Sequence, residues 1–173
     1  GPTQVSVGIW MVDITNIDSA QQNFTADIAV VLRWKDARLA HTGAGLAHYA
    51  LDQIWTPRVS IANETSSVVR KLSESAEVEP DGTVLYRQRY VGSFTQPLRL
   101  QSFPFDRQAF RIQFVAVRYQ PNEVTFVPDQ NWIRDGLREG AGISRSVTLP
   151  DWTVERWDAK PDVYALTPGL QYS

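Results

Sequence analysis

Hydrophobic and polar residues alternate along several stretches of the chain, as they do in β-strands that bury one face. The longest such stretch is residues 24–34, where every second side chain from Phe24 to Leu32 is apolar. Residues 5–15 are rich in β-branched and aromatic side chains, and the odd positions from Val5 to Asp13 share one face. The short polar run between the two stretches predicts a hairpin loop.

Turn signals, such as the Pro-Asp-Gly of residues 80–82, separate further predicted strands. Residues 83–91 alternate again, with Tyr86 and Arg89 on opposite faces, whereas residues 46–51 predict one short helical turn. The other predicted strands are residues 59–62, 110–116, 124–127 and 151–157. Together they predict an all-β fold, an immunoglobulin-like antiparallel β-sandwich of about nine to ten strands.

Length and composition predict one globular domain. The chain has 173 residues, of which 43% are hydrophobic and 21% charged. Its net charge of −2 gives no electrostatic support for binding nucleic acid. No apolar run approaches the roughly 20 residues that a membrane-spanning helix needs. Gly1 and Pro2 are typical of the remnant left after protease removal of a tag, so the predicted domain is residues 3–173.

Candidate catalytic and metal-binding groups are sparse. The chain has no cysteine, which excludes a disulfide framework, a thiolate metal site and a cysteine nucleophile. His41 and His48 are too few to hold a metal without further ligands, and no hydrolase or phosphate-loop motif is present. We therefore predict a protein that is not an enzyme, with no cofactor and no metal. Six tryptophans leave two alternatives open, core packing or an exposed face for carbohydrate stacking.

Residues 100–110 contain an unusual aromatic turn. Pro104 ends the strand before it, Phe103 and Phe105 need burial, and Asp106 can accept backbone hydrogen bonds that close a turn. A rigid, aromatic, acid-bearing loop of this kind is suited to docking on another surface.

Five motifs, in order, carry a resemblance to a known family. They are Trp-Lys-Asp-Ala-Arg-Leu at 34–39, Ile-Trp-Thr-Pro at 54–57, Pro-Asp-Gly-Thr-Val at 80–84, Phe-Pro-Phe-Asp at 103–106 and Asp-Trp at 151–152. With them the chain resembles the extracellular domain of the pentameric ligand-gated ion channels, the Cys-loop receptor superfamily, and most of all its prokaryotic branch without cysteines. Residues 98–109 then correspond to the signature loop, with Gln96 and Phe110 where animal receptors carry the two cysteines.

The resemblance implies a ligand-sensing domain on the periplasmic or extracellular face of a membrane. Five identical subunits would form a ring, a small molecule would bind between neighbours, and residues 16–22 and 98–109 would couple binding to a pore. A final strand and four membrane helices, absent from residues 3–173, complete the family's subunit. The implied coupling residues are Asp18, Phe103, Pro104, Phe105 and Asp106.

The resemblance also suggests ligand-binding residues. Positions that form an aromatic box for amines in the family are here Ala29, Ala62 and Val117, which disfavours an amine at that site. Arg89 and Arg118 match arginines of proton-gated relatives and would suit a carboxylate, the alternative being surface arginines that are solvated or ion-paired. The candidate ligand-binding residues are Arg89, Arg118, Tyr119, Tyr164, Tyr86 and Asn63. Two other functions stay open, a soluble binding protein of this fold without a pore and an unrelated carbohydrate-binding sandwich.

Overall fold

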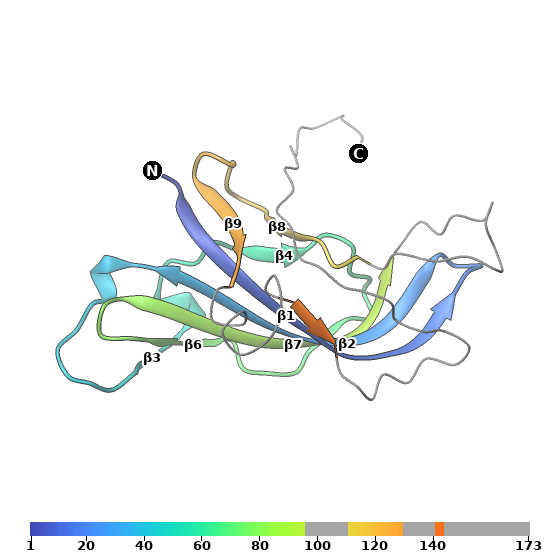
Figure 1. Cartoon of the computed structure of the whole chain (residues 1–173), viewed down its shortest axis with the longest axis horizontal. Helices are drawn as coiled ribbons and strands as arrows, with labels where there is room; N and C mark the ends of the chain where they lie inside the picture. Colours follow the sequence, from blue (N-terminus) through green and yellow to red (C-terminus); the bar gives the residue numbers. More distant parts are fainter. Residues whose placement is uncertain (96–110, 130–140, 144–173) are drawn as a thin grey trace.

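The computed structural model describes residues 1–95, 111–129 and 141–143 (Figure 1). These residues form ten strands, which are arranged in two sheets, and two short 3₁₀ helices. The predicted all-β sandwich is confirmed. Within these residues, no helix has both the length and the apolar character needed to cross a membrane.

The larger sheet has eight strands. They are β1 (Thr3–Asp18), β2 (Asn23–Lys35), β3 (Ala47–Ala50), β5 (Val69–Arg70), β6 (Ser75–Val78), β7 (Thr83–Thr95), β9 (Val124–Pro128) and β10 (Ala141–Ile143). β1, β2 and β7 are long neighbours at its centre, and β5 and β6 pair with β7. The sheet is mixed because β9 and β10 pair with β1 in parallel, whereas the other pairings are antiparallel.

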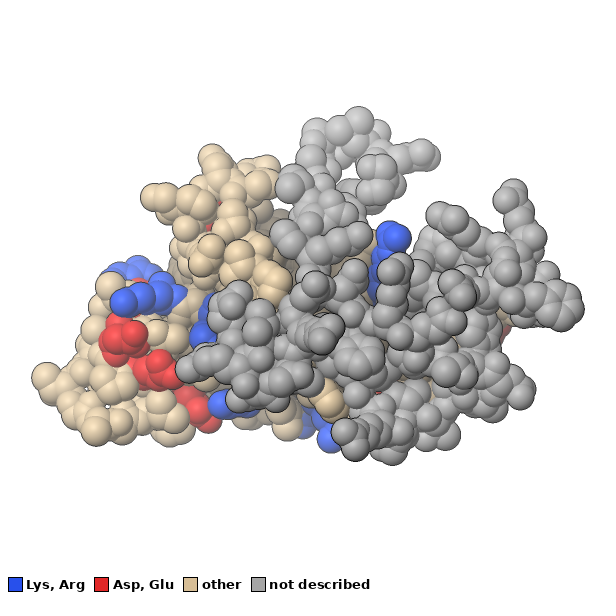
Figure 2. Space-filling view, in the orientation of Figure 1, with Lys and Arg blue, Asp and Glu red and all other residues tan. Residues whose placement is uncertain are grey.

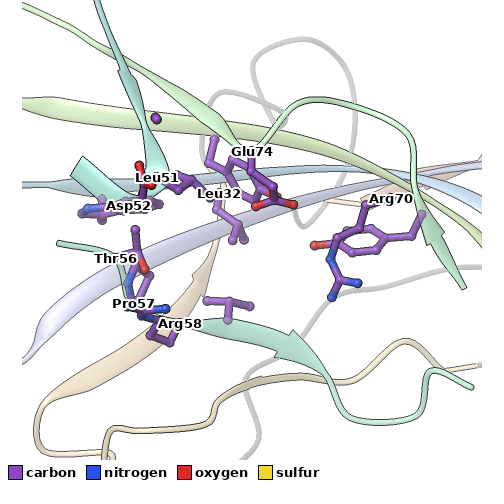
Figure 3. Close-up of a pocket in the computed structure, with 13 residues that line it drawn as sticks. Leu32, Leu51, Asp52, Thr56, Pro57, Arg58, Arg70 and Glu74 are labelled. Atoms are coloured by element: carbon purple, nitrogen blue, oxygen red, sulfur yellow. The ribbon is translucent and has the colours of Figure 1, made fainter. Parts of the chain in front are cut away.

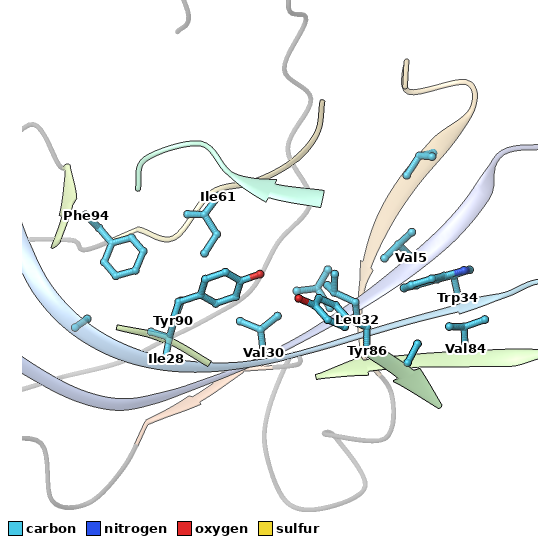
Figure 4. Close-up of a cluster of buried hydrophobic side chains, with 14 of the residues drawn as sticks. Val5, Ile28, Val30, Leu32, Trp34, Ile61, Val84, Tyr86, Tyr90 and Phe94 are labelled. Carbon is cyan, nitrogen blue, oxygen red and sulfur yellow. The ribbon is translucent and has the colours of Figure 1, made fainter. Parts of the chain in front are cut away.

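The smaller sheet pairs β4 (Val59–Ile61) with β8 (Phe114–Ala116), and its side chains close the core over the larger sheet. Figure 4 shows Ile61 of β4 on the opposite side of the core from Ile28 and Val30 of β2. Every second residue of β2 is buried, as the sequence predicted. Phe24 and Phe94 stack at 5.6 Å between ring centroids and fill the end of the core next to the β1–β2 loop.

The predicted face of β1 is wrong beyond Met11. Register shifts between Met11 and Asp13, and between Ile14 and Asn16, each place one extra residue in β1 opposite β2. Ile14 therefore returns to the buried face, whereas Asp13 pairs with Asp27 on the other face. Two bulges thus keep the apolar side chains of a long strand directed at one core.

Two other local predictions need correction. Residues 46–51 are not a helical turn, because Ala47–Ala50 pairs with β6 as β3, and the 3₁₀ helix η2 (Leu51–Gln53) follows it. The hairpin loop predicted at 16–22 is shorter, since β1 continues to Asp18 and β2 begins at Asn23. A second 3₁₀ helix, η1 (Ala37–Leu39), begins after Asp36.

The strand predicted at 110–116 is also shorter among the described residues, where only Phe114–Ala116 is a strand. The Asn63 side chain bonds the carbonyl of Arg111 and the N–H of Gln113, so these backbone groups have a side-chain partner there. The predicted strand at 151–157 lies outside the described residues.

Candidate functional site

Arg89 lies on the outer face of β7, away from the core. Its guanidinium donates two hydrogen bonds to the Asp27 carboxylate of β2, at 2.7 and 2.6 Å. This bidentate contact raises the pKa of Arg89 above its already high value. The sequence left open whether Arg89 binds a ligand or is an ion-paired surface arginine. In this single chain it is ion-paired, with Asp27.

Arg118 and Tyr119 follow β8 in a turn. Arg118 is exposed and has no ion pair with any described residue. Tyr119 is half-buried, and its hydroxyl accepts a hydrogen bond of 3.0 Å from Trp55 Nε1. The ring centroids of Trp55 and Tyr119 lie 5.6 Å apart. Tyr119 is therefore held in place by Trp55, whereas the neighbouring Arg118 side chain is exposed to solvent.

Asn63 is 8% exposed and joins three segments of the chain. Its amide nitrogen donates to the carbonyls of Thr95 at 3.0 Å and Arg111 at 2.6 Å, and its amide oxygen accepts from Gln113 N–H at 3.1 Å. Every polar atom of this side chain is therefore engaged within the subunit, where it fixes the ends of β7 and β8 beside β4.

Tyr86 lies on the core face of β7, opposite to Arg89. Its hydroxyl donates to the Glu74 carboxylate, at 2.9 and 3.0 Å to the two oxygens, and accepts from Gln88 Nε2 at 3.0 Å. Burial raises the pKa of Tyr86, so the phenol stays neutral and continues to donate at physiological pH.

A cavity of about 570 Å³ lies next to Tyr86 between the two sheets (Figure 3). Leu32, Tyr86 and Tyr90 of the larger sheet form one wall. Side chains of the connecting segments complete the lining, among them Asp52, Arg58, Arg70 and Glu74. Sequence reasoning missed this cavity, although Gln88 between two tyrosines on a buried face was a signal that polar contacts are needed there.

The predicted site residues that the structure describes therefore do not meet in one place within a single chain. Tyr86 borders the cavity, which is open to solvent, Arg89 lies on the outer face of the sheet, and Arg118 lies beyond β8. Tyr164 lies outside the described residues. In Figure 2, acidic side chains gather at one end of the described part of the visible face, with basic side chains above them and others scattered over the rest, so no single basic patch covers it. The described residues also contain no group of three or more side chains suited to hold a metal ion.

The family described as "Neurotransmitter-gated ion-channel ligand binding domain" matches residues 1–162. The chain belongs to this family. The chain is also similar to a proton-gated ion channel of Gloeobacter violaceus, which is 27% identical over 98% of this chain and 46% of the relative. The γ-aminobutyric acid receptor subunit alpha-2 of Bos taurus and that of Homo sapiens are each 26% identical over 72% of this chain and 29% of the relative. The chain spans less than half the length of these relatives.

Membership in this ligand-binding domain family confirms the resemblance seen in the sequence. It rules out the alternative of an unrelated carbohydrate-binding sandwich. The tryptophans agree with it, since Trp34 is only 3% exposed and packs edge-to-face with Trp55 at 6.5 Å between centroids. Trp152 lies outside the described residues. The relatives named above are ion channels and receptor subunits, not enzymes.

The structure describes residues 16–22, which contain the loop between β1 and β2. Asp18 ends β1, and its carboxylate accepts the Gln21 N–H at 3.0 Å. Gln22 then adopts a φ of +52°, which reverses the chain into β2. The other proposed coupling residues, Phe103, Pro104, Phe105 and Asp106, lie outside the described residues.

Proposed function

We propose that this ligand-binding domain senses a small effector at the interface between identical subunits of a pentameric channel, on the periplasmic or extracellular face of a membrane. The observation that carries the proposal is the family match over residues 1–162, together with the proton-gated channel that aligns with 98% of the chain. Ligand binding favours one arrangement of the subunits, and the domain passes that preference to the pore.

The interface site contains Arg89, Arg118, Tyr119 and Tyr164 and takes a ligand with a carboxylate. The exposure of Arg118 and its lack of an ion pair with any described residue support this chemistry, because its charge is available to a ligand. A ligand carboxylate would compete with Asp27 for Arg89, whose bidentate contact has the geometry that carboxylates require. Asn63 and Tyr86 contribute from within the subunit by fixing the strands that carry these residues.

Coupling runs through residues 16–22 and 98–109. The Asp18 turn is held by its own carboxylate, so a displacement of β1 and β2 is passed to the loop between them as a rigid body. The signature loop, with Phe103, Pro104, Phe105 and Asp106, would contact the membrane part of the protein beside it.

The test is the current carried by a full-length channel that bears this domain, with a panel of carboxylates and their amine counterparts as effectors. We expect Arg118→Gln and Arg89→Gln each to raise the half-maximal carboxylate concentration about tenfold, since each removes one charge-assisted contact. Arg87→Gln is the matched control, because Arg87 lies on the same face of β7 and pairs with Glu77. Equal responses of all three variants to carboxylates would overturn the interface site, and a purified protein without five subunits would overturn the assembly.

A further inference from the structure

Within a single chain, the Arg89 guanidinium already holds a carboxylate. Its Nε and Nη2 atoms donate to the two oxygens of Asp27, at 2.7 and 2.6 Å. The contact is the shortest ion pair among the described residues. A planar fork of two parallel hydrogen bonds is also how arginine binds the carboxylate of a ligand. Asp27 therefore occupies the same donors that a ligand carboxylate needs.

The strand register leaves Arg89 accessible although it is paired. The residue directly opposite Arg89 on β2 is Ala29, whereas Asp27 lies opposite Val91, so the ion pair runs diagonally between the strands. Ala29 offers only a methyl group beside the guanidinium. The Arg89 side chain keeps 45% of its surface exposed, and that of Asp27 keeps 20%. A small anion can therefore approach the guanidinium from solvent over Ala29.

Asp13 of β1 lies directly opposite Asp27, on the same outer face of the sheet. Register shifts on either side of residues 13 and 14 place it there, since strict alternation would have put it on the core face. Like charges directly opposite each other on neighbouring strands are destabilising. An Asp27 carboxylate released from Arg89 would face Asp13 without the guanidinium that offsets this repulsion. Asp13 therefore favours the contact between Asp27 and Arg89.

We propose that Asp27 is an internal competitor of the ligand, a carboxylate of the chain itself that the ligand carboxylate displaces from Arg89. This inference rests on the proposed function, because it concerns the anion that Arg89 binds in the interface site. The strength of the pair between Asp27 and Arg89 then sets the effector concentration at which the domain responds. Asp13 raises that concentration, because it makes the release of Asp27 less favourable.

The test is the current of a full-length channel that bears this domain, with propionate and benzoate as probes. We expect Asp27→Asn to lower the half-maximal concentration of both probes about threefold to tenfold, because the amide keeps the side-chain shape but cannot form the charged fork. Glu77→Gln is the matched control, since it removes the carboxylate partner of Arg87 on the same face of β7, and it should leave the response unchanged. A half-maximal concentration in Asp27→Asn equal to or above that of the wild type overturns the proposal.

An Arg89→Gln background separates competition from general repulsion. Without the guanidinium there is nothing to compete for, so adding Asp27→Asn to Arg89→Gln should not shift the half-maximal concentration. An undiminished shift in that background overturns the proposal, because Asp27 would then act on the probes only through its charge. If Asp27→Asn fails to assemble, Asp13→Asn serves instead, with an expected decrease of about twofold. No such decrease overturns the proposal as well.

Failure of the interface site itself has a different signature. A wild-type channel that responds to neither probe, or responses that Arg89→Gln leaves unchanged, would overturn the interface site and this inference together. A response that weakens in Arg89→Gln and stays at the wild-type value in Asp27→Asn would leave the interface site standing and overturn the internal competitor alone.

Discussion

The buried side chain that organises the polar contacts under the sheet is Gln88. It is 1% exposed, and its amide bonds the Leu72 backbone twice, accepting from the N–H at 2.7 Å and donating to the C=O at 3.0 Å. The same nitrogen lies 3.0 Å from Glu74 Oε1 and from the Tyr86 hydroxyl. One side-chain amide thus acts as a strand partner for residue 72 and fixes the polar wall of the cavity.

Removing that amide should be costly. In Gln88→Leu, the Leu72 N–H and C=O both lose the side-chain amide that they bond, so we expect the free energy of unfolding to fall by about 1–3 kcal/mol for the two hydrogen bonds. Urea denaturation followed by tryptophan fluorescence measures the change. Gln120→Leu is the control, because Gln120 is exposed and its side chain makes no described hydrogen bond, and its effect should stay within about 0.5 kcal/mol. A smaller loss in Gln88→Leu than in Gln120→Leu would contradict this role.

Asp36 makes the stability of the fold depend on pH in the acid range. Its carboxylate caps η1 by accepting the Arg38 N–H and binds the Arg38 guanidinium at 2.8–2.9 Å, which holds the pKa of Asp36 below its usual 3.8. Because the folded pKa is the lower one, this contribution to stability is present above pH 3.8 and is lost as the pH falls through the folded pKa.

Comparison with Asp36→Asn isolates this acid dependence. Asparagine keeps the helix cap but has no charge to lose, so the midpoint of urea unfolding should fall less between pH 7 and pH 3 than in the wild type. Parallel decline of the two proteins over that range would exclude an Asp36 contribution.

At the scale of elements, the connection from β4 to β6 crosses closely over β7. Thr65 N–H bonds the Ser93 carbonyl at 3.1 Å, and the Ser67 hydroxyl accepts the Ser93 N–H at 3.0 Å. Gly92 lies under this crossing with a φ of +153°. A Cβ at this position would lie 2.6 Å from Val68 Cα, so the two segments approach as closely as they do because residue 92 has no side chain.

Gly92→Ala should therefore destabilise the fold by about 1–3 kcal/mol, through backbone strain and displacement of the crossing segment. Thermal unfolding measured by circular dichroism reports the loss. Gly45→Ala is its matched control, because Gly45 has open space where the methyl group would lie, and its melting temperature should stay near that of the wild type. Identical melting temperatures of the two variants would show that the crossing tolerates a side chain.

At the scale of the whole molecule, the surface carries little net charge. The total of −2 and a pI near 5.7 predict no general attraction to polyanions. We expect the protein to pass through a heparin column at physiological ionic strength without retention. Retention that declines with added salt would reveal a basic surface and would reopen a role with nucleic acid or other polyanions.

Much of this architecture could be predicted from sequence because it depends on local periodicity. The alternation in residues 24–34 fixed the buried face of β2, and that in residues 83–91 placed Tyr86 and Arg89 on opposite faces. Alternation could not reveal the bulges of β1, since an extra residue changes the face of everything after it and is stabilised only by pairing with β2. Residues 46–51 were misread for a similar reason, because β3 is a strand through its pairing with β6.

By itself, the sequence determined the all-β class, the central strands and the family, because these depend on side-chain period and on motifs fixed in order along the chain. Only the tertiary structure decided how the functional groups are partnered. Asp27 and Arg89 are 62 residues apart in the sequence, and Gln88 bonds the backbone of Leu72, which is 16 residues away. Periodicity within a single strand cannot predict either contact. The cavity exists only once β4 and the segments around it close over β2 and β7, since its walls come from elements that are distant in the chain and meet through packing.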